Sequence, residues 1–308
     1  RENKCCCNGN VQISVTEFSE ALLVKNIVGL QDTPVQAGGI VVARKGKPEP
    51  WENTMTDLKT TGLAVTENGT VTANGDIITG CLGSGIHIEG ARSTVNLIGT
   101  RISACAGAAI ICEEGTSSIH RTILNGNLSG AIFGPDAAVE FINNTVVAAP
   151  AAVGRGIAVN GRQGSGCYNN IVVGYSVGFF LEESPVIDYN CTFGNQGYNG
   201  PPGTGGAHAL QADPLFDAQG ATGYELLSNS PCIDAGHPDA QYNDPDGSRS
   251  DIGALPYGGT SAVDGLSVPG TPQLIATPSV TRGIVALEVR DAGSIENGAL
   301  LSVYAVNG

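Results

Sequence analysis

Three side chains in two neighbouring apolar segments have the chemistry that acid–base catalysis requires. His87 and Glu89 alternate with isoleucines, so in a strand they point away from the apolar face. Glu113 takes the place of Glu89 in the next segment. Two carboxylates held close together are the acid and base of glycoside hydrolysis, and their oxygens also suit Ca²⁺. A solvated acidic face is the competing interpretation, and the sequence leaves both open.

A second acidic group lies near residue 250. Asp244, Asp246 and Asp251 surround Gly247 in a pattern that partly matches calcium-binding loops. The further acidic ligands of an EF-hand are missing. In the structural alternative, Arg249 pairs with one of the aspartates and locks the loop. Ca²⁺ is thus the one cofactor that the sequence suggests.

Cysteines offer a different chemistry. Cys81 and Cys105 each come three residues after an aligned isoleucine, so stacking would bring them within disulfide distance. Two small buried thiols are the alternative. The consecutive Cys5, Cys6 and Cys7 could bind a metal or cross-link chains, although no second cluster of metal ligands lies nearby in the sequence.

Charge and composition exclude several classes of protein. The net charge is −14, whereas nucleic-acid-binding proteins carry a basic stripe and anionic membranes attract basic surfaces. No apolar run approaches the length of about 18 residues that a membrane-spanning helix needs. With 44 glycines in 308 residues and few charged side chains, the chain favours short strands and tight turns.

The elements that position these residues are repeated strands. A small residue followed by alternating apolar residues recurs every 22–25 residues. The first apolar residues of successive repeats are Ile40, Leu63, Ile86, Ile110, Ile132, Ile157 and Phe179. A second apolar column contains Val28, Met55, Ile78, Ile102, Leu124, Val147, Val172 and Phe193. Such repeats stack at the strand spacing of about 4.8 Å, which predicts an all-β parallel β-helix with the first column turned inward.

Asparagines recur at one position of the later repeats. Asn144, Asn169 and Asn190 each stand shortly before an aligned apolar residue. Asparagine tolerates turn conformations, and stacked amides bond along the stack. We therefore expect these three side chains to form a ladder.

The repeats over residues 11–255 resemble the right-handed parallel β-helix superfamily that includes pectate lyases. The segment from Asp213 to Ala254, with Ser230–Gly236 and Asp244–Ala254, is similar to the closing motif of secreted bacterial β-helix proteins. The resemblance implies a right-handed parallel β-helix over residues 1–257 with about 22–25 residues per coil, in a secreted or cell-surface bacterial protein.

The composition changes after this region. Residues 258–272 are typical of a linker, and residues 273–308 offer a short C-terminal β-strand extension. This extension resembles part of a FlgD-like secretion-sorting sandwich.

Two function classes remain. Ile111, Phe133 and Phe180 are expected on the outer face, where they would form an apolar contact surface. This favours a non-catalytic extracellular protein that is structural, adhesive or self-assembling. The alternative is a polysaccharide lyase or glycoside hydrolase with Glu89, Glu113 and His87 as candidate catalytic residues. The expected partners are a second copy or a surface partner, or a polysaccharide.

Overall fold

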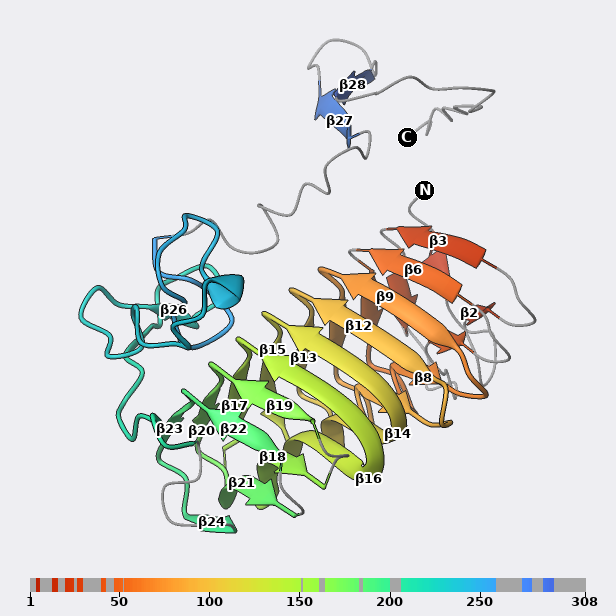
Figure 1. The fold of residues 1–308 in the computed structure, drawn as a ribbon. Coiled ribbons are helices and arrows are strands. Elements are labelled where there is room, and N and C mark those ends of the chain that lie inside the picture. Colours follow the sequence, from red (N-terminus) through yellow and green to blue (C-terminus); the bar gives the residue numbers. More distant parts are fainter. Residues whose placement is uncertain are drawn as a thin grey trace. The chain divides into compact units, whose positions relative to one another are not determined.

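The computed structural model describes residues 53–150, 152–160, 164–182, 185–199 and 206–258, and the strands outside these ranges. The strands of the coils, β1 to β24, pair in parallel with strands about one repeat away in the sequence (Figure 1). The structure therefore confirms the parallel β-helix that the repeats predict. The chain divides into two units, residues 1–263 and 264–308.

A nine-stranded sheet forms one side of the coils. Its strands, in hydrogen-bonded order, are β1 (Lys4–Cys5), β4 (Ile27–Gly29), β7 (Thr54–Thr56), β10 (Ile77–Thr79), β13 (Arg101–Ser103), β15 (Ile123–Asn127), β17 (Thr145–Ala148), β20 (Ile171–Val173) and β23 (Cys191–Phe193). Its residues are rich in isoleucine, valine and threonine, which fit a pleated surface.

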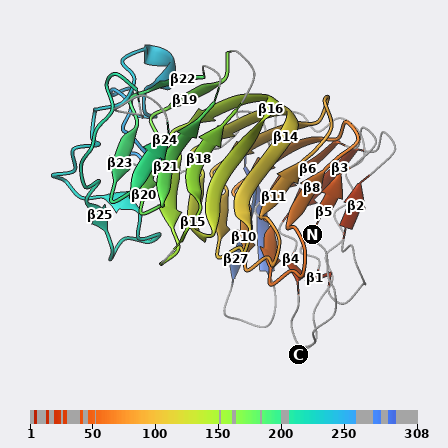
Figure 2. The same cartoon turned by 90° about the horizontal axis from the view of Figure 1, so that it is seen from below.

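A 15-stranded sheet supplies the other two rows of strands (Figure 2). The first row contains β2 (Ile13–Val15), β5 (Ile40–Val42), β8 (Leu63–Val65), β11 (Ile86–Ile88), β18 (Arg155–Val159), β21 (Val177–Leu181) and β24 (Gly197–Asn199). The second contains β3 (Glu20–Val24), β6 (Lys47–Trp51), β9 (Thr70–Asn74), β12 (Thr94–Ile98), β19 (Gly166–Tyr168) and β22 (Val186–Asp188). The long strands β14 (Ala108–His120) and β16 (Ser129–Ile142) run through both rows.

A glycine lets β14 pass from one row to the other. The pairing register shifts between Cys112 and Glu114, and Gly115 follows with a φ of 100°. A Cβ atom on Gly115 would lie 2.5 Å from the carbonyl oxygen of Ser93. This corner therefore requires glycine, for both its backbone conformation and its close approach.

The core is a stack of inward side chains from all three rows. Ile86, Ile110, Ile157 and Phe179 are each 0% exposed, as predicted. Their strands pair so that Ile86 lies beside Ile110, and Ile157 beside Phe179. The alternation of strand side chains therefore leaves His87 on the outer face.

The prediction was wrong by one residue in β16. Ala131 and Phe133 pair with Ile110 and Cys112 and point inward, and Ile132 points outward. Phe133 is 1% exposed, so it belongs to the core and not to an outer contact surface. In β14 the inward pair is the large Ile110 and the small Cys112, whereas in β16 it is the small Ala131 and the large Phe133. The two pairs fill a similar core volume.

The second column shows the same kind of error. Val146 and Thr192, not Val147 and Phe193, continue the inward column. Val146 is 0% exposed, whereas Phe193 is 41% exposed.

A polar column precedes the strands of the nine-stranded sheet, and it contains Asn170 in place of the expected Asn169. Asn144 donates from its backbone and from Nδ2 to Asn170 Oδ1, at 2.9 and 3.0 Å. Asn170 donates in the same way to Asn190 Oδ1, at 2.8 and 2.9 Å. All three side chains are 0% exposed, so the ladder satisfies polar groups inside the stack.

Asn169 instead holds residues 213–257, which follow the last coil and are called the closing segment below. With Asn143 it adopts positive φ at the corner before the sheet. Asn169 Nδ2 donates to Ser250 Oγ at 3.2 Å, and its Oδ1 accepts from the backbone of His237 at 2.7 Å. Asn143 Nδ2 donates to the carbonyl oxygen of Asp251 at 2.8 Å. These buried amides anchor the closing segment on the coils.

The closing segment contains little regular structure. It includes β25 (Phe216–Asp217), β26 (Glu225–Leu226) and the 3-10 helix η1 (Ala240–Tyr242). In the C-terminal unit, β27 (Gln273–Pro278) pairs antiparallel with β28 (Val285–Arg290). In the part of the chain that the structure describes, no helix has the length and apolar character needed to cross a membrane.

Candidate binding site

The predicted acid–base residues lie together on the outer face of β11 and β14. His87 Nε2 is 3.2 Å from Glu113 Oε1, and 34% and 58% of the two side chains are exposed. Ile88 pairs with Cys112, and both side chains point into the core. The next residue, Glu89, is therefore on the outer face, and it is exposed there. An apolar pocket raises the pKa of a carboxylic acid so that it can serve as the general acid of a glycosidase. On this face both side chains of the pair are open to solvent.

The three aspartates of the proposed Ca²⁺ loop do not converge. Asp244 accepts a hydrogen bond from the backbone of Asp251 at 2.8 Å, and Asp251 accepts from Asp234 and Tyr257. Asp246 is exposed and bonds to a nearby serine. No group of three or more histidine, cysteine or acidic side chains is placed to hold a metal within the described ranges.

The arginine that pairs with this loop is not the expected one. Arg121 Nη2 lies 3.1 Å from Asp244 Oδ1, and only 3% of the Asp244 side chain is exposed. Arg249 instead donates to the carbonyl oxygen of Gly236 at 2.8 Å. Burial raises the pKa of Asp244, although Arg121 acts in the opposite direction.

The cysteine pair is stacked in the core. Cys81 and Cys105 are both buried free thiols, and each shifts the pKa of the other. A disulfide between them stays a prediction. The side chains of Cys5, Cys6 and Cys7 lie outside the described residues.

Only part of the predicted contact surface is on the outside. Ile111 and Phe180 are partly buried on the outer face, and Ile132 replaces Phe133 between them. The Arg155 guanidinium lies 3.5 Å from the centre of the Phe180 ring. This stacked cation shields one face of the ring from solvent.

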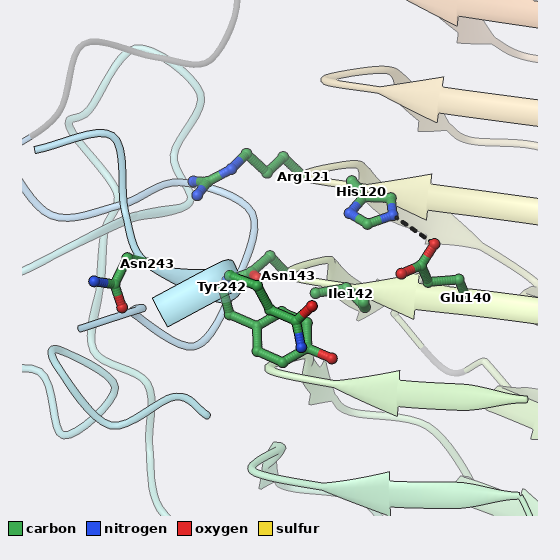
Figure 3. Close-up of a pocket in the computed structure, with 8 residues that line it drawn as sticks. His120, Arg121, Glu140, Ile142, Asn143, Tyr242 and Asn243 are labelled. Atoms are coloured by element: carbon green, nitrogen blue, oxygen red, sulfur yellow. Dashed lines mark ion pairs between the residues drawn. The ribbon is translucent and has the colours of Figure 1, made fainter. Parts of the chain in front are cut away.

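The structure reveals a different site, where β14 and β16 end against the closing segment (Figure 3). A pocket of about 190 Å³ lies there. It is lined by His120, Arg121, Glu140, Ile142, Asn143, Gln241, Tyr242 and Asn243. In Figure 3, His120 and Glu140 face each other from neighbouring strands, and Tyr242 approaches from η1.

Hydrogen bonds orient the acidic side of this pocket. Ser118 Oγ lies 3.0 Å from Glu140 Oε2 and 2.9 Å from His120 Nε2. The His120 and Glu140 atoms themselves are 3.5 Å apart. Burial lowers the pKa of His120, and the Glu140 carboxylate only partly offsets this effect. The imidazole is therefore mainly neutral at pH 7 and can donate or accept a hydrogen bond.

Aromatic rings extend from the pocket along the edge of the coils. A connected series of ring contacts joins Tyr168, Tyr189, His208, His237 and Tyr242. His208 is stacked on Tyr189 with the ring centres 4.6 Å apart, and His208 Nδ1 lies 2.7 Å from Asp188 Oδ2. We call these five residues the ring cluster. Burial raises the pKa values of Tyr168 and Tyr242, so both phenols keep their proton and can donate hydrogen bonds.

Comparison with known proteins identifies the coils. A family model described as "Right handed beta helix region" matches residues 5–172, more than half of the chain. The chain belongs to the right-handed β-helix family. No curated protein and no solved structure matches this β-helix protein.

Sequence reasoning missed the pocket of this β-helix protein. The sequence pattern alone could have shown that Ser118 and His120 share the outer face, because they alternate with buried residues of one strand. It could not have shown that they lie near Tyr242, because this contact joins residues more than 100 positions apart in the chain.

Replacing Glu140 by glutamine should lower the pKa of His120 further. Burial favours the neutral ring, and the Glu140 carboxylate is the group that opposes it. Because a depressed histidine pKa destabilises the fold as the pH falls through about 6.5, E140Q should also deepen that loss. An NMR titration of the imidazole Cε1 protons would measure the shift. E113Q, which alters the His87 pair, should leave His120 unchanged; an equal response in both variants would contradict the assignment.

Proposed function

We propose that this β-helix protein is a non-catalytic extracellular scaffold that binds a polysaccharide along the ring cluster and its pocket. The observation that carries the proposal is the ring cluster itself. Five aromatic rings from four stretches of the chain gather on one edge. Four of them are partly buried, and His208 is exposed. Rings that only filled a core would be covered.

The chemistry of the site suits a sugar. Tyrosine rings offer an apolar face with a polar tip, which matches the apolar face and hydroxyl rim of a pyranose. Beside them, Glu140 and Asn143 offer acceptors, and His120, Arg121 and Gln241 offer donors. The volume of about 190 Å³ is below the roughly 300 Å³ of an enclosing ligand pocket. It therefore suits one residue of a longer chain that continues over the rings.

A polysaccharide-active enzyme is the alternative use of the same fold. Glu140 would be its acid or base, because its carboxylate faces the pocket (Figure 3). However, Ser118 and His120 both contact Glu140 Oε2, and the site contains no second carboxylate among its lining residues. Glycoside hydrolysis generally uses a pair. Binding without turnover thus has the better physical support.

Self-association of the coils stays a prediction. The burial of Phe133 removes one of the two phenylalanines of the expected contact surface, and Arg155 covers part of the other, Phe180. A secreted or cell-surface location is likewise proposed here, on the similarity of the closing motif.

Tyr242→Ala should weaken polysaccharide binding about tenfold, because losing one stacked ring costs on the order of 1 kcal/mol. Affinity electrophoresis against neutral and acidic polysaccharides would measure it. Tyr242→Phe keeps the ring and should retain most of the affinity. Tyr257→Ala is the matched control, because Tyr257 is a 45% exposed tyrosine of the closing segment that is not a member of the ring cluster.

Two outcomes would overturn the proposal. Equal loss in Tyr242→Ala and Tyr257→Ala, or no binding to any polysaccharide by the parent protein, would remove the ring cluster as a site. Release of reducing ends that E140Q abolishes would instead establish the enzymatic alternative.

A further inference from the structure

Two buried cysteines join the last coil to the closing segment. Cys191 is the first residue of β23, the final strand of the nine-stranded sheet. Cys232 lies in the closing segment, about 40 residues later in the chain. Both are 0% exposed and belong to a small core with Ile171, Leu226 and Ile252. The structure holds both as free thiols, and each shifts the pKa of the other, as neighbouring side chains in one small core do.

The backbone on both sides holds this contact in place. Cys191 donates from its backbone to the carbonyl oxygen of Asn170 at 2.8 Å. The carbonyl oxygen of Cys232 accepts from the backbone of Ile252 at 2.9 Å, and its N–H donates to Ser230 Oγ at 3.2 Å. The two side chains therefore share one small core because two anchored backbone segments meet there.

We propose that Cys191 and Cys232 form a disulfide that fastens the closing segment to the last coil, made by exchange with an external low-molecular-weight disulfide. This bond differs in kind from one between Cys81 and Cys105. Those residues stack in adjacent coils, which the strand ladder already joins. The bond from Cys191 would tie the coils to an irregular segment that few strands hold.

The exchange balances in two steps. The Cys191 thiolate attacks one sulfur of the external disulfide and expels a thiolate, which leaves a mixed disulfide on Cys191. The Cys232 thiolate then attacks the Cys191 sulfur and expels the second thiolate. The two protons lost by the cysteines pass to the two leaving thiolates, so two protein thiols are oxidised while one external disulfide is reduced to two thiols.

Burial decides when the exchange can take place, and the reverse order, with Cys232 attacking first, gives the same product. Since both residues are fully buried once the closing segment is in place, exchange precedes its docking, and the finished bond is out of reach of external thiols.

The bond would also support the ring cluster. His237 and Tyr242 follow Cys232 in the closing segment, so a tie at Cys232 limits how far their rings can separate from Tyr168 and Tyr189. It would further close the open end of the stack, where a solenoid otherwise exposes its core.

Thiol mapping of the full chain refolded with oxidised glutathione would test the proposal. The protein is denatured and alkylated without reduction, then digested at acidic residues, because no lysine or arginine lies between Arg162 and Arg249. We expect Cys191 and Cys232 to escape alkylation and to appear in one linked peptide pair. Cys167 is the internal control, because it is as buried in the folded protein as the two proposed partners, at 0% exposed. Since no disulfide is proposed for it, it should be alkylated in every denatured sample.

A variant series gives the second readout. Reduction of the unfolded chain before refolding should lower the thermal midpoint of the parent by several degrees, because removing a disulfide restores freedom to the unfolded chain. C191A/C232A should lose this response, and C81A/C105A should retain it. Full alkylation of Cys191 in the oxidised protein, or its linkage to any cysteine other than Cys232, would overturn the proposal.

Discussion

Phe133→Ala should lower the free energy of unfolding by about 3–5 kcal/mol, because it removes a large ring from a closed core. Phe133 is 1% exposed, and its ring meets that of Phe141 edge to face with the centres 5.7 Å apart. The neighbouring inward residue, Ala131, is too small to fill the vacated space. Urea denaturation of the full chain, followed by far-UV circular dichroism, would measure the loss.

Ile132→Ala is the matched control for this prediction. Ile132 is the adjacent residue of the same strand but points outward and is partly buried. Its truncation should cost clearly less than that of Phe133. If Ile132→Ala were the more damaging variant, the register of β16 would be one residue out and the sequence-based alignment would be right after all.

Asn170→Ala should cost about 3 kcal/mol, the second largest effect that we expect. Asn170 Oδ1 accepts two hydrogen bonds from Asn144, and its Nδ2 donates to the carbonyl oxygen of Phe141 at 2.8 Å and to Asn190. Alanine would leave the Asn144 N–H and the Phe141 carbonyl without these partners, in a place that water does not reach. Thermal unfolding monitored by circular dichroism would report the change.

Two further asparagines separate the ladder from other effects. Asn96→Ala on the outer side of β12 should change stability by less than about 0.5 kcal/mol. Asn169→Ala should release the closing segment, because its bonds go to His237 and Ser250. Faster hydrogen exchange confined to residues near 237 and 250 would identify that effect. Equal destabilisation by Asn96→Ala and Asn170→Ala would contradict the ladder.

The amino-acid sequence by itself determined the fold class and the position of most coils. A repeat of 22–25 residues with alternating apolar positions can bury its apolar side only by stacking, so the parallel β-helix followed from the pattern. The column Ile86, Ile110, Ile157 and Phe179 was placed correctly for this reason. The existence of an asparagine ladder also followed, because asparagines recurred at one position of successive repeats.

The strand register within single coils could not be predicted from the sequence. In Ala131–Ile132–Phe133 and in Asn169–Asn170, two adjacent residues both satisfy the pattern, and a slip of one residue exchanges the inner and outer faces. Coil lengths vary with the corners, as at Gly115, so counting from the previous coil does not resolve the choice.

The candidate binding site was decided by tertiary structure alone. Its halves lie at the ends of β14 and β16 and in the closing segment, and Arg121 meets Asp244 across more than 100 residues of chain. Each half contains ordinary surface residue types, and no local period connects them. Only docking of the closing segment on Asn143 and Asn169 brings Tyr242 to His120 and Glu140, because those contacts depend on where two anchored segments meet in space.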